Sequence, residues 1–157
     1  MFFFRSVSSM RAHQHLTLPF TRGYRGNAMN RPTVFFTKHH EYVKRASKTT
    51  YYVGITQFAA DALGDIVYVD MTLEPGDTVI EGETYGQIES VKSSSDLIMP
   101  LDATIVSVNH TALEDFEQLS TSPEETWICE VELANHHKIV SLMTDDEYEN
   151  YKDENRS

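Results

Sequence analysis

The sequence is short of the residues that would support several classes of protein. It has one cysteine, Cys129, which excludes an internal disulfide framework and a metal cluster held by cysteines alone. It has no apolar run of 18 residues, so we expect no transmembrane helix and no membrane partner. Lys and Arg number 13 against 24 Asp and Glu, a balance that argues against general nucleic-acid binding. The 40% of hydrophobic residues still suffices for one packed domain.

Acidic residues are missing from the start of the chain, where the first is Glu41. Residues 1–31 instead hold five arginines and several serines and threonines, a composition typical of a mitochondrial transit peptide. Arg5 interrupts the apolar start, so no secretory signal is expected. We predict a transit peptide over residues 1–32, location in the mitochondrial matrix, and a folded domain over residues 33–157. A basic arm that stays attached is the alternative.

Basic residues are scarce in the middle of the chain. Between Lys48 and Lys138 there are 17 acidic residues and a single basic one, Lys92. One explanation is a surface ion pair with Glu89 or Asp96, worth about 0–1 kcal/mol. The other is that the amine is retained for its reactivity. Counting charges leaves both open.

Short apolar runs dominate the predicted secondary structure. About nine of them recur at spacings near ten residues, which predicts an antiparallel sandwich or flattened barrel. The run at residues 65–70 is apolar on both faces and is expected to be a buried strand. Thr56 and Gly64 predict the N-cap and the end of a short helix, and Thr144 with Glu147 predicts the capping box of a C-terminal helix. Residues 110–123 are expected to be mostly loop, with room for single helical turns.

Lys92 lies where the predicted strand 85–91 gives way to Ser93–Ser95. A weak repeat, in which residues 78–91 and 97–109 both suggest strand, turn and strand, places it on the connection between two halves of the barrel. Such a hairpin tip would present the amine to an enzyme. A surface cation, a Schiff-base former and an acylation site are the possible roles. Schiff-base chemistry is disfavoured because surrounding acids raise a lysine pKa, whereas acylation needs only access.

The residues around Lys92 resemble a known family. Gly82, Gly86, Glu89–Lys92 and Asp96 are similar to the lipoyl-attachment region of the H proteins of the glycine cleavage system. The similarity covers about residues 34–152 in order and spacing, including His40–Val43 and Pro75–Asp77. His39 stands where the family commonly has serine, and the segment before Trp127 lacks the family's glycines.

The resemblance implies a fold, a cofactor and partners. The fold would be mainly β, a lipoyl-type barrel-sandwich hybrid with short helices after residue 56 and at the C-terminus. Lys92 would carry (R)-lipoate in amide linkage, on a carrier protein without turnover of its own. The arm would take the aminomethyl group of glycine from the P protein, a pyridoxal-phosphate-dependent glycine decarboxylase. It would pass this group to the T protein, an aminomethyltransferase, and present dihydrolipoyl to the L protein, a dihydrolipoamide dehydrogenase.

Three carboxylates are candidates for roles beside Lys92. Glu89 would help the lipoyl-attaching enzyme recognise its target. Glu41 and Asp96 map onto the family's cleft carboxylates and would hold the cationic amine of the loaded arm. No metal site is expected, since His136 and His137 have no matching ligands nearby in the sequence, and Cys129 is expected in the core.

Two other functions stay open. One is a lipoyl or biotinyl domain of another complex. Biotin acceptors usually flank the lysine with methionine, where this chain has Val91 and Ser93, and domains of the 2-oxo-acid dehydrogenases usually have aspartate before the lysine. The other is a relay or interaction protein, in which Lys92 passes lipoyl groups to other enzymes or stays unmodified.

Overall fold

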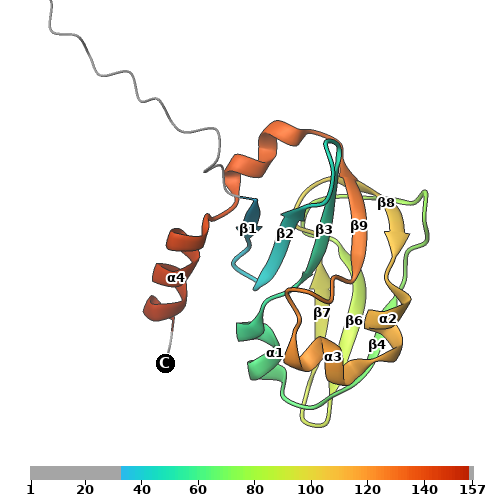
Figure 1. The fold of residues 1–157 in the computed structure, drawn as a ribbon, viewed down its shortest axis with the longest axis vertical. Helices are drawn as coiled ribbons and strands as arrows, with labels where there is room; N and C mark the ends of the chain where they lie inside the picture. The colour runs from blue at the N-terminus through green and yellow to red at the C-terminus, as the bar shows by residue number, and fades with distance from the viewer. Residues whose placement is uncertain (1–32, 156–157) are drawn as a thin grey trace, which may run out of the picture. The chain divides into compact units, whose positions relative to one another are not determined.

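The computed structural model describes residues 33–155, which form two antiparallel sheets (Figure 1). The predicted transit peptide lies outside the described residues. The larger sheet has the strand order β1-β2-β3-β9-β8-β5, and the smaller one has the order β4-β6-β7. The strands of the larger sheet are β1 (Val34–Phe36), β2 (Glu41–Arg45), β3 (Thr50–Ile55), β9 (Cys129–Leu133), β8 (Ala103–Val108) and β5 (Thr78–Val79). Those of the smaller sheet are β4 (Ile66–Met71), β6 (Thr84–Ser90) and β7 (Ser94–Ile98).

The core lies between the two sheets, and strands such as β6 and β9 alternate side chains that enter it with side chains that face outward. Tyr85 and Ile88 of β6 are fully buried, as are Cys129 and Val131 of β9 from the opposite sheet. All four belong to one apolar cluster that runs through both sheets. The placement predicted for Cys129, in the core, is confirmed.

The strand pairings place Lys92 between two similar halves. β6 pairs with β7 through Glu89 opposite Ser94, and β5 pairs with β8 through Thr78 opposite Thr104. The two halves, β5–β6 and β7–β8, therefore pair with each other. β6 is antiparallel to β7, β5 is antiparallel to β8, and the β6–β7 turn lies between the halves. This agrees with the weak repeat in the sequence.

Two predictions about strands were wrong. β4 is not buried on both faces, because Val67 is 48% and Tyr68 is 50% exposed. A register shift between Ile66 and Tyr68 turns both side chains outward, and β4 pairs only with β6 in the described part of the chain. The strand expected from residue 97 begins earlier, because β7 starts at Ser94, three residues before its apolar part. The polar residues belong to the strand because their backbone pairs with β6, and this pairing does not depend on side-chain polarity.

The helices lie at the ends of the sheets (Figure 1). α1 (Gln57–Leu63) has the predicted boundaries: Thr56 caps its first turn and Gly64, at φ 78°, ends it. Residues 110–123, expected to be mostly loop with room for single helical turns, contain two short helices, α2 (His110–Glu114) and α3 (Phe116–Thr121). Their N-caps are the side chains of Asn109 and Asp115, which the sequence pattern did not single out.

The C-terminal segment packs against β1, the first strand of the described residues. It contains a 3₁₀ helix, η1 (His136–Ser141), and then α4 (Asp145–Glu154). α4 has the predicted capping box of Thr144 and Glu147. Met143 forms a β-bridge with Phe36 of β1, and this contact brings α4 beside β1. No helix within residues 33–155 is both long and apolar enough to cross a membrane.

Candidate functional site

Lys92 lies at the tip of the β6–β7 hairpin, as the sequence predicted. The Ser90 amide donates to the carbonyl of Ser93 at 2.7 Å, and the Ser90 hydroxyl accepts from the Ser93 amide at 3.1 Å. These bonds close a tight turn whose two central residues, Val91 and Lys92, are both exposed. The amide of Val91 also donates to the carbonyl of Asp65 at 3.0 Å. The tip is therefore rigid in its backbone while its side chains face solvent.

The amine of Lys92 is accessible and unpaired within the described structure. None of the ion pairs among residues 33–155 includes it, so neither Glu89 nor Asp96 neutralises it. Its stem passes over the end of α1, where a Cβ on Gly64 would lie 3.3 Å from Lys92 Cε and 3.5 Å from Nζ. The ion-pair explanation of the isolated lysine is therefore not supported, and the requirement of access is met.

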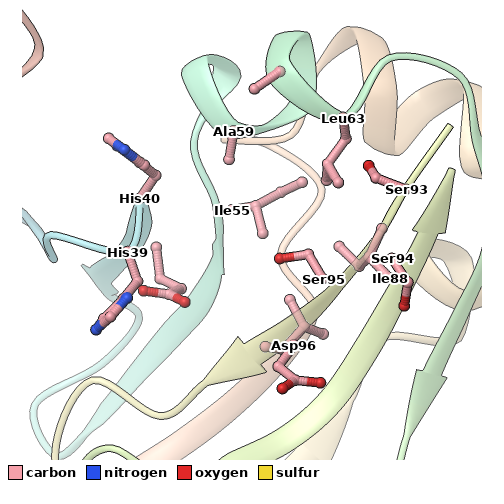
Figure 2. A pocket seen from close by; sticks show the side chains of 13 residues that line it. His39, His40, Ile55, Ala59, Leu63, Ile88, Ser93, Ser94, Ser95 and Asp96 are labelled. Atoms are coloured by element: carbon pink, nitrogen blue, oxygen red, sulfur yellow. The ribbon is translucent and has the colours of Figure 1, made fainter. Parts of the chain in front are cut away.

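A cleft of about 310 Å³ opens beside the hairpin (Figure 2). One wall consists of α1 and the turn that leads into β2, and the other is the start of β7. Ile55, Leu63 and Ile88 supply apolar surface, and the polar groups are on the serines of β7 and on residues 39–41 and 96. An aliphatic chain attached to Lys92 could lie on the apolar surface with its polar end among these groups.

Glu41 is the buried carboxylate of this cleft, with an exposure of 3%. One of its oxygens accepts from the Thr37 hydroxyl, and the other accepts from the Ile98 amide at 3.3 Å. Burial raises the pKa of Glu41 above its ordinary value, although both hydrogen bonds oppose that shift. The carboxylate is thus held in the wall of the cleft by one hydrogen bond to each oxygen.

The three predicted carboxylates are not all in one place. Asp96 of β7 is exposed and lines the cleft with Glu41. Glu89 of β6 is exposed but does not line it, and in the sheet it stands between Tyr68 and Ser94. The structure therefore brings together the two proposed cleft residues and leaves Glu89 on the hairpin, three residues from Lys92. No group of three or more His, Cys, Asp and Glu side chains in the described part of the chain could hold a metal ion.

Comparison with known proteins decides the family. A family model for the glycine cleavage H-protein matches residues 34–155. The chain belongs to this family. It is 41% identical over 127 residues to a putative mitochondrial glycine cleavage system H protein of Schizosaccharomyces pombe, covering 80% of this chain and 74% of that protein. It is 40% identical over 121 residues to the H protein of Listeria monocytogenes, covering 76% of this chain and 95% of that one.

A solved H-protein structure confirms the fold. The crystal structure of the glycine cleavage system H protein of Mycobacterium marinum matches with a TM-score of 0.69 at 34% identity, over 79% of this chain and 99% of that chain. The predicted lipoyl-type barrel-sandwich with short helices is therefore confirmed, as is the resemblance read from the sequence. These relatives do not favour the two alternative functions, a domain of another complex and a relay protein.

Residues around the cleft of this H protein also make contacts that the sequence did not predict. His40 lies in the turn before β2 with φ at 67°, and its Nδ1 is 2.8 Å from the hydroxyl of Tyr148 in α4. His39, Ser94 and Ser95 line the cleft as well. Tyr148 belongs to the helix that the capping box of Thr144 and Glu147 predicts, but 108 residues separate it from His40, and no local sequence pattern indicates a contact of that range.

Proposed function

We propose that this chain is a lipoyl carrier of the mitochondrial glycine cleavage system, with Lys92 as the attachment residue. The observation that carries the proposal is the unpaired lysine at the tip of a rigid hairpin, beside a cleft of suitable size, in a member of the H-protein family. The mitochondrial name of the fission-yeast relative and the arginine-rich residues 1–32 support the matrix as its location.

The hairpin gives a modifying enzyme the access that it needs. Val91 is 74% exposed and Lys92 and Ser93 are exposed with it, so the tip can enter another protein's active site without unfolding. Glu89 stands on the same hairpin, where the lipoyl-attaching enzyme could contact it. Amide formation removes the positive charge of Lys92, and no partner carboxylate in the described structure loses an ion pair when this happens.

The cleft suits an arm that carries a cationic group. (R)-Lipoate, when attached, supplies a disulfide whose two sulfurs exchange by thiolate chemistry and carry the transferred group. Ile55, Leu63 and Ile88 would hold the aliphatic part of the arm and exclude water from it. Glu41 and Asp96 would accept hydrogen bonds from a protonated amine at its end.

The partners follow from this role. The P, T and L proteins would each receive the hairpin tip in turn, while this chain carries the group and performs no turnover. Residues 33–157 have a net charge of −16, which favours partner surfaces that are basic around the active-site entrance. Covalent tethering raises the local concentration of the carried group to about the mM scale for a short flexible link.

Exchange of labelled bicarbonate into glycine, measured with the lipoylated chain and a glycine decarboxylase, tests the proposal. Lys92→Arg should abolish the exchange, because its guanidinium keeps the charge but cannot take the lipoyl group. Lys138→Arg is the matched control, since Lys138 is an exposed lysine already paired with Glu81 and Asp102, and it should leave exchange unchanged. Exchange that persists in Lys92→Arg would overturn the assignment.

A further inference from the structure

Tyr148 of α4 has a buried hydroxyl that apolar packing does not explain. Its side chain is 3% exposed, and its ring stacks on Phe36 at a centroid distance of 4.5 Å and an angle of 5°. A phenylalanine would make the same stack. The hydroxyl nevertheless has two partners: Nδ1 of His40 at 2.8 Å and Oγ1 of Thr56 at 2.9 Å.

Those two partners belong to the two segments that form one wall of the cleft. His40 is in the turn that leads to Glu41, and Thr56 is the N-cap of α1, where its Oγ1 accepts from the Ala59 amide at 3.3 Å. The backbone amide of Thr56 donates to the His40 carbonyl at 2.9 Å. His40 and Ala59 both line the cleft, and in Figure 2 the His40 ring turns away from Ser95 and Asp96 on the opposite wall.

The backbone at His40 needs such support. Its φ of 67° is in the left-handed region, which is unfavourable for a residue with a Cβ. The ring is held from two sides, by Phe58 of α1 at 4.5 Å and by Tyr148 and Tyr151 of α4 at 5.7 and 5.9 Å between centroids. The C-terminal helix therefore contacts the residue with left-handed backbone that directly precedes β2.

The order of donors and acceptors that we take for this network runs from Thr56 through Tyr148 to His40. The Thr56 hydroxyl accepts from the Ala59 amide and donates to Tyr148 Oη, and the Tyr148 hydroxyl donates to an unprotonated His40 Nδ1. Burial, with smaller contributions from His39 and Lys152, lowers the pKa of His40 and favours this neutral ring. Burial raises the pKa of Tyr148 to about 12, so the donor keeps its proton.

We infer that Tyr148 is a positioning residue for the cleft: its hydroxyl joins the turn of His40 to the N-cap of α1, so that the docked C-terminal helix sets the shape of the wall facing β7. That this wall receives the lipoyl arm rests on the proposed function. The dependence of the wall on Tyr148 does not.

Tyr148→Phe tests the inference, because it removes the hydroxyl and keeps the ring. Tyr151→Phe is the matched control: it removes a hydroxyl from the same helix, one that donates only to the Lys38 carbonyl at 3.2 Å. In the full chain without the lipoyl group, we expect amide hydrogen exchange at Thr56 and Ala59 to rise about ten-fold in Tyr148→Phe, as the loss of hydrogen bonds predicts. Exchange at Val131 in the core should change by the same small factor in both variants.

Titration of the His40 ring by NMR is the second measurement. Losing the donor to Nδ1 destabilises the neutral ring, so the pKa of His40 should rise in Tyr148→Phe and stay unchanged in Tyr151→Phe. A purely structural role for Tyr148 would lower stability without this local signature. Equal exchange and equal titration in the two variants would overturn the inference.

The lipoylated variants test the link to the arm. Tyr148→Phe should raise the KM for the carrier in the glycine exchange reaction at unchanged kcat, whereas Tyr151→Phe should not. An unchanged KM would refute the link to the arm. If the unaltered lipoylated chain supports no exchange at all, the proposed function has failed, and the measurements on the unlipoylated chain still decide the role of Tyr148.

Discussion

Gly64 offers a sharp test of how Lys92 is held. It ends α1 with φ 78° and ψ −137°, a backbone conformation that is nearly restricted to glycine. Gly64→Ala should introduce strain of about 1–3 kcal/mol, reduced by about 0.4–1 kcal/mol because alanine restricts the unfolded chain. We therefore expect a net loss of about 1–2 kcal/mol in the free energy of unfolding, measured by urea denaturation of the unlipoylated protein.

The same substitution places a methyl group against the lysine. The new Cβ would lie 3.3 Å from Lys92 Cε and 3.5 Å from Nζ. The first distance is shorter than an ordinary van der Waals contact. These atoms are the far end of a flexible side chain, so a change of rotamer relieves the contact for less than about 1 kcal/mol. The initial rate of lipoylation, followed by intact-protein mass spectrometry, should then stay within about five-fold of the unaltered protein.

Gly82→Ala separates the two effects. Gly82 has φ 86°, and no heavy atom beyond its two chain neighbours lies within 4 Å of an added Cβ, so this variant has backbone strain without any contact to the lysine. Both variants should lose similar stability and keep similar lipoylation rates. The contrary result is lipoylation that slows by about ten-fold or more in Gly64→Ala but not in Gly82→Ala. Such a loss corresponds to about 1.4 kcal/mol or more of activation free energy. It would show that the amine is fixed against α1 and would refute the reasoning.

Two further predictions concern buried ionisable groups. Burial raises the folded-state pKa of Glu41, so the folded chain binds the proton more tightly than the unfolded chain and loses stability as pH rises from 4.5 through the folded pKa. Glutamine does not titrate, so in urea unfolding the stability of Glu41→Gln relative to the unaltered protein should increase as the pH rises from 4 to 7. A difference in stability between the two proteins that is independent of pH would contradict this. Burial raises the pKa of Cys129 to about 12, so the unlipoylated protein should resist iodoacetamide at neutral pH until it is unfolded. Rapid alkylation of the folded protein would be the contrary result.

Local features of the fold were predictable because their causes are local. Thr56 and Gly64 bound α1, and Thr144 with Glu147 begins α4, since capping depends on residues three or four positions apart. The hairpin at Lys92 was predictable for a similar reason, as a strand followed by a polar run. Strand burial was less predictable: Val67 and Tyr68 have apolar side chains, but the register shift that exposes them depends on pairing with β6.

The site was predictable only as far as the resemblance extended. Lys92 and its neighbours Glu89 and Asp96 lie within one short segment, and the family's pattern covers it. The pair of Glu41 and Asp96 comes from β2 and β7, which belong to different sheets, and the bond between His40 and Tyr148 spans 108 residues. Contacts of this range depend on how the whole chain packs, and no periodicity in the sequence encodes them.

The central claim is that the amine of Lys92 carries the lipoyl group. Its most direct test is the mass of the native protein isolated from mitochondria that make lipoate, followed by tandem mass spectrometry of the peptide containing residue 92. The account predicts a chain heavier by one lipoyl group, with the whole increment on Lys92. An unmodified chain, or an increment on any other residue, would contradict it.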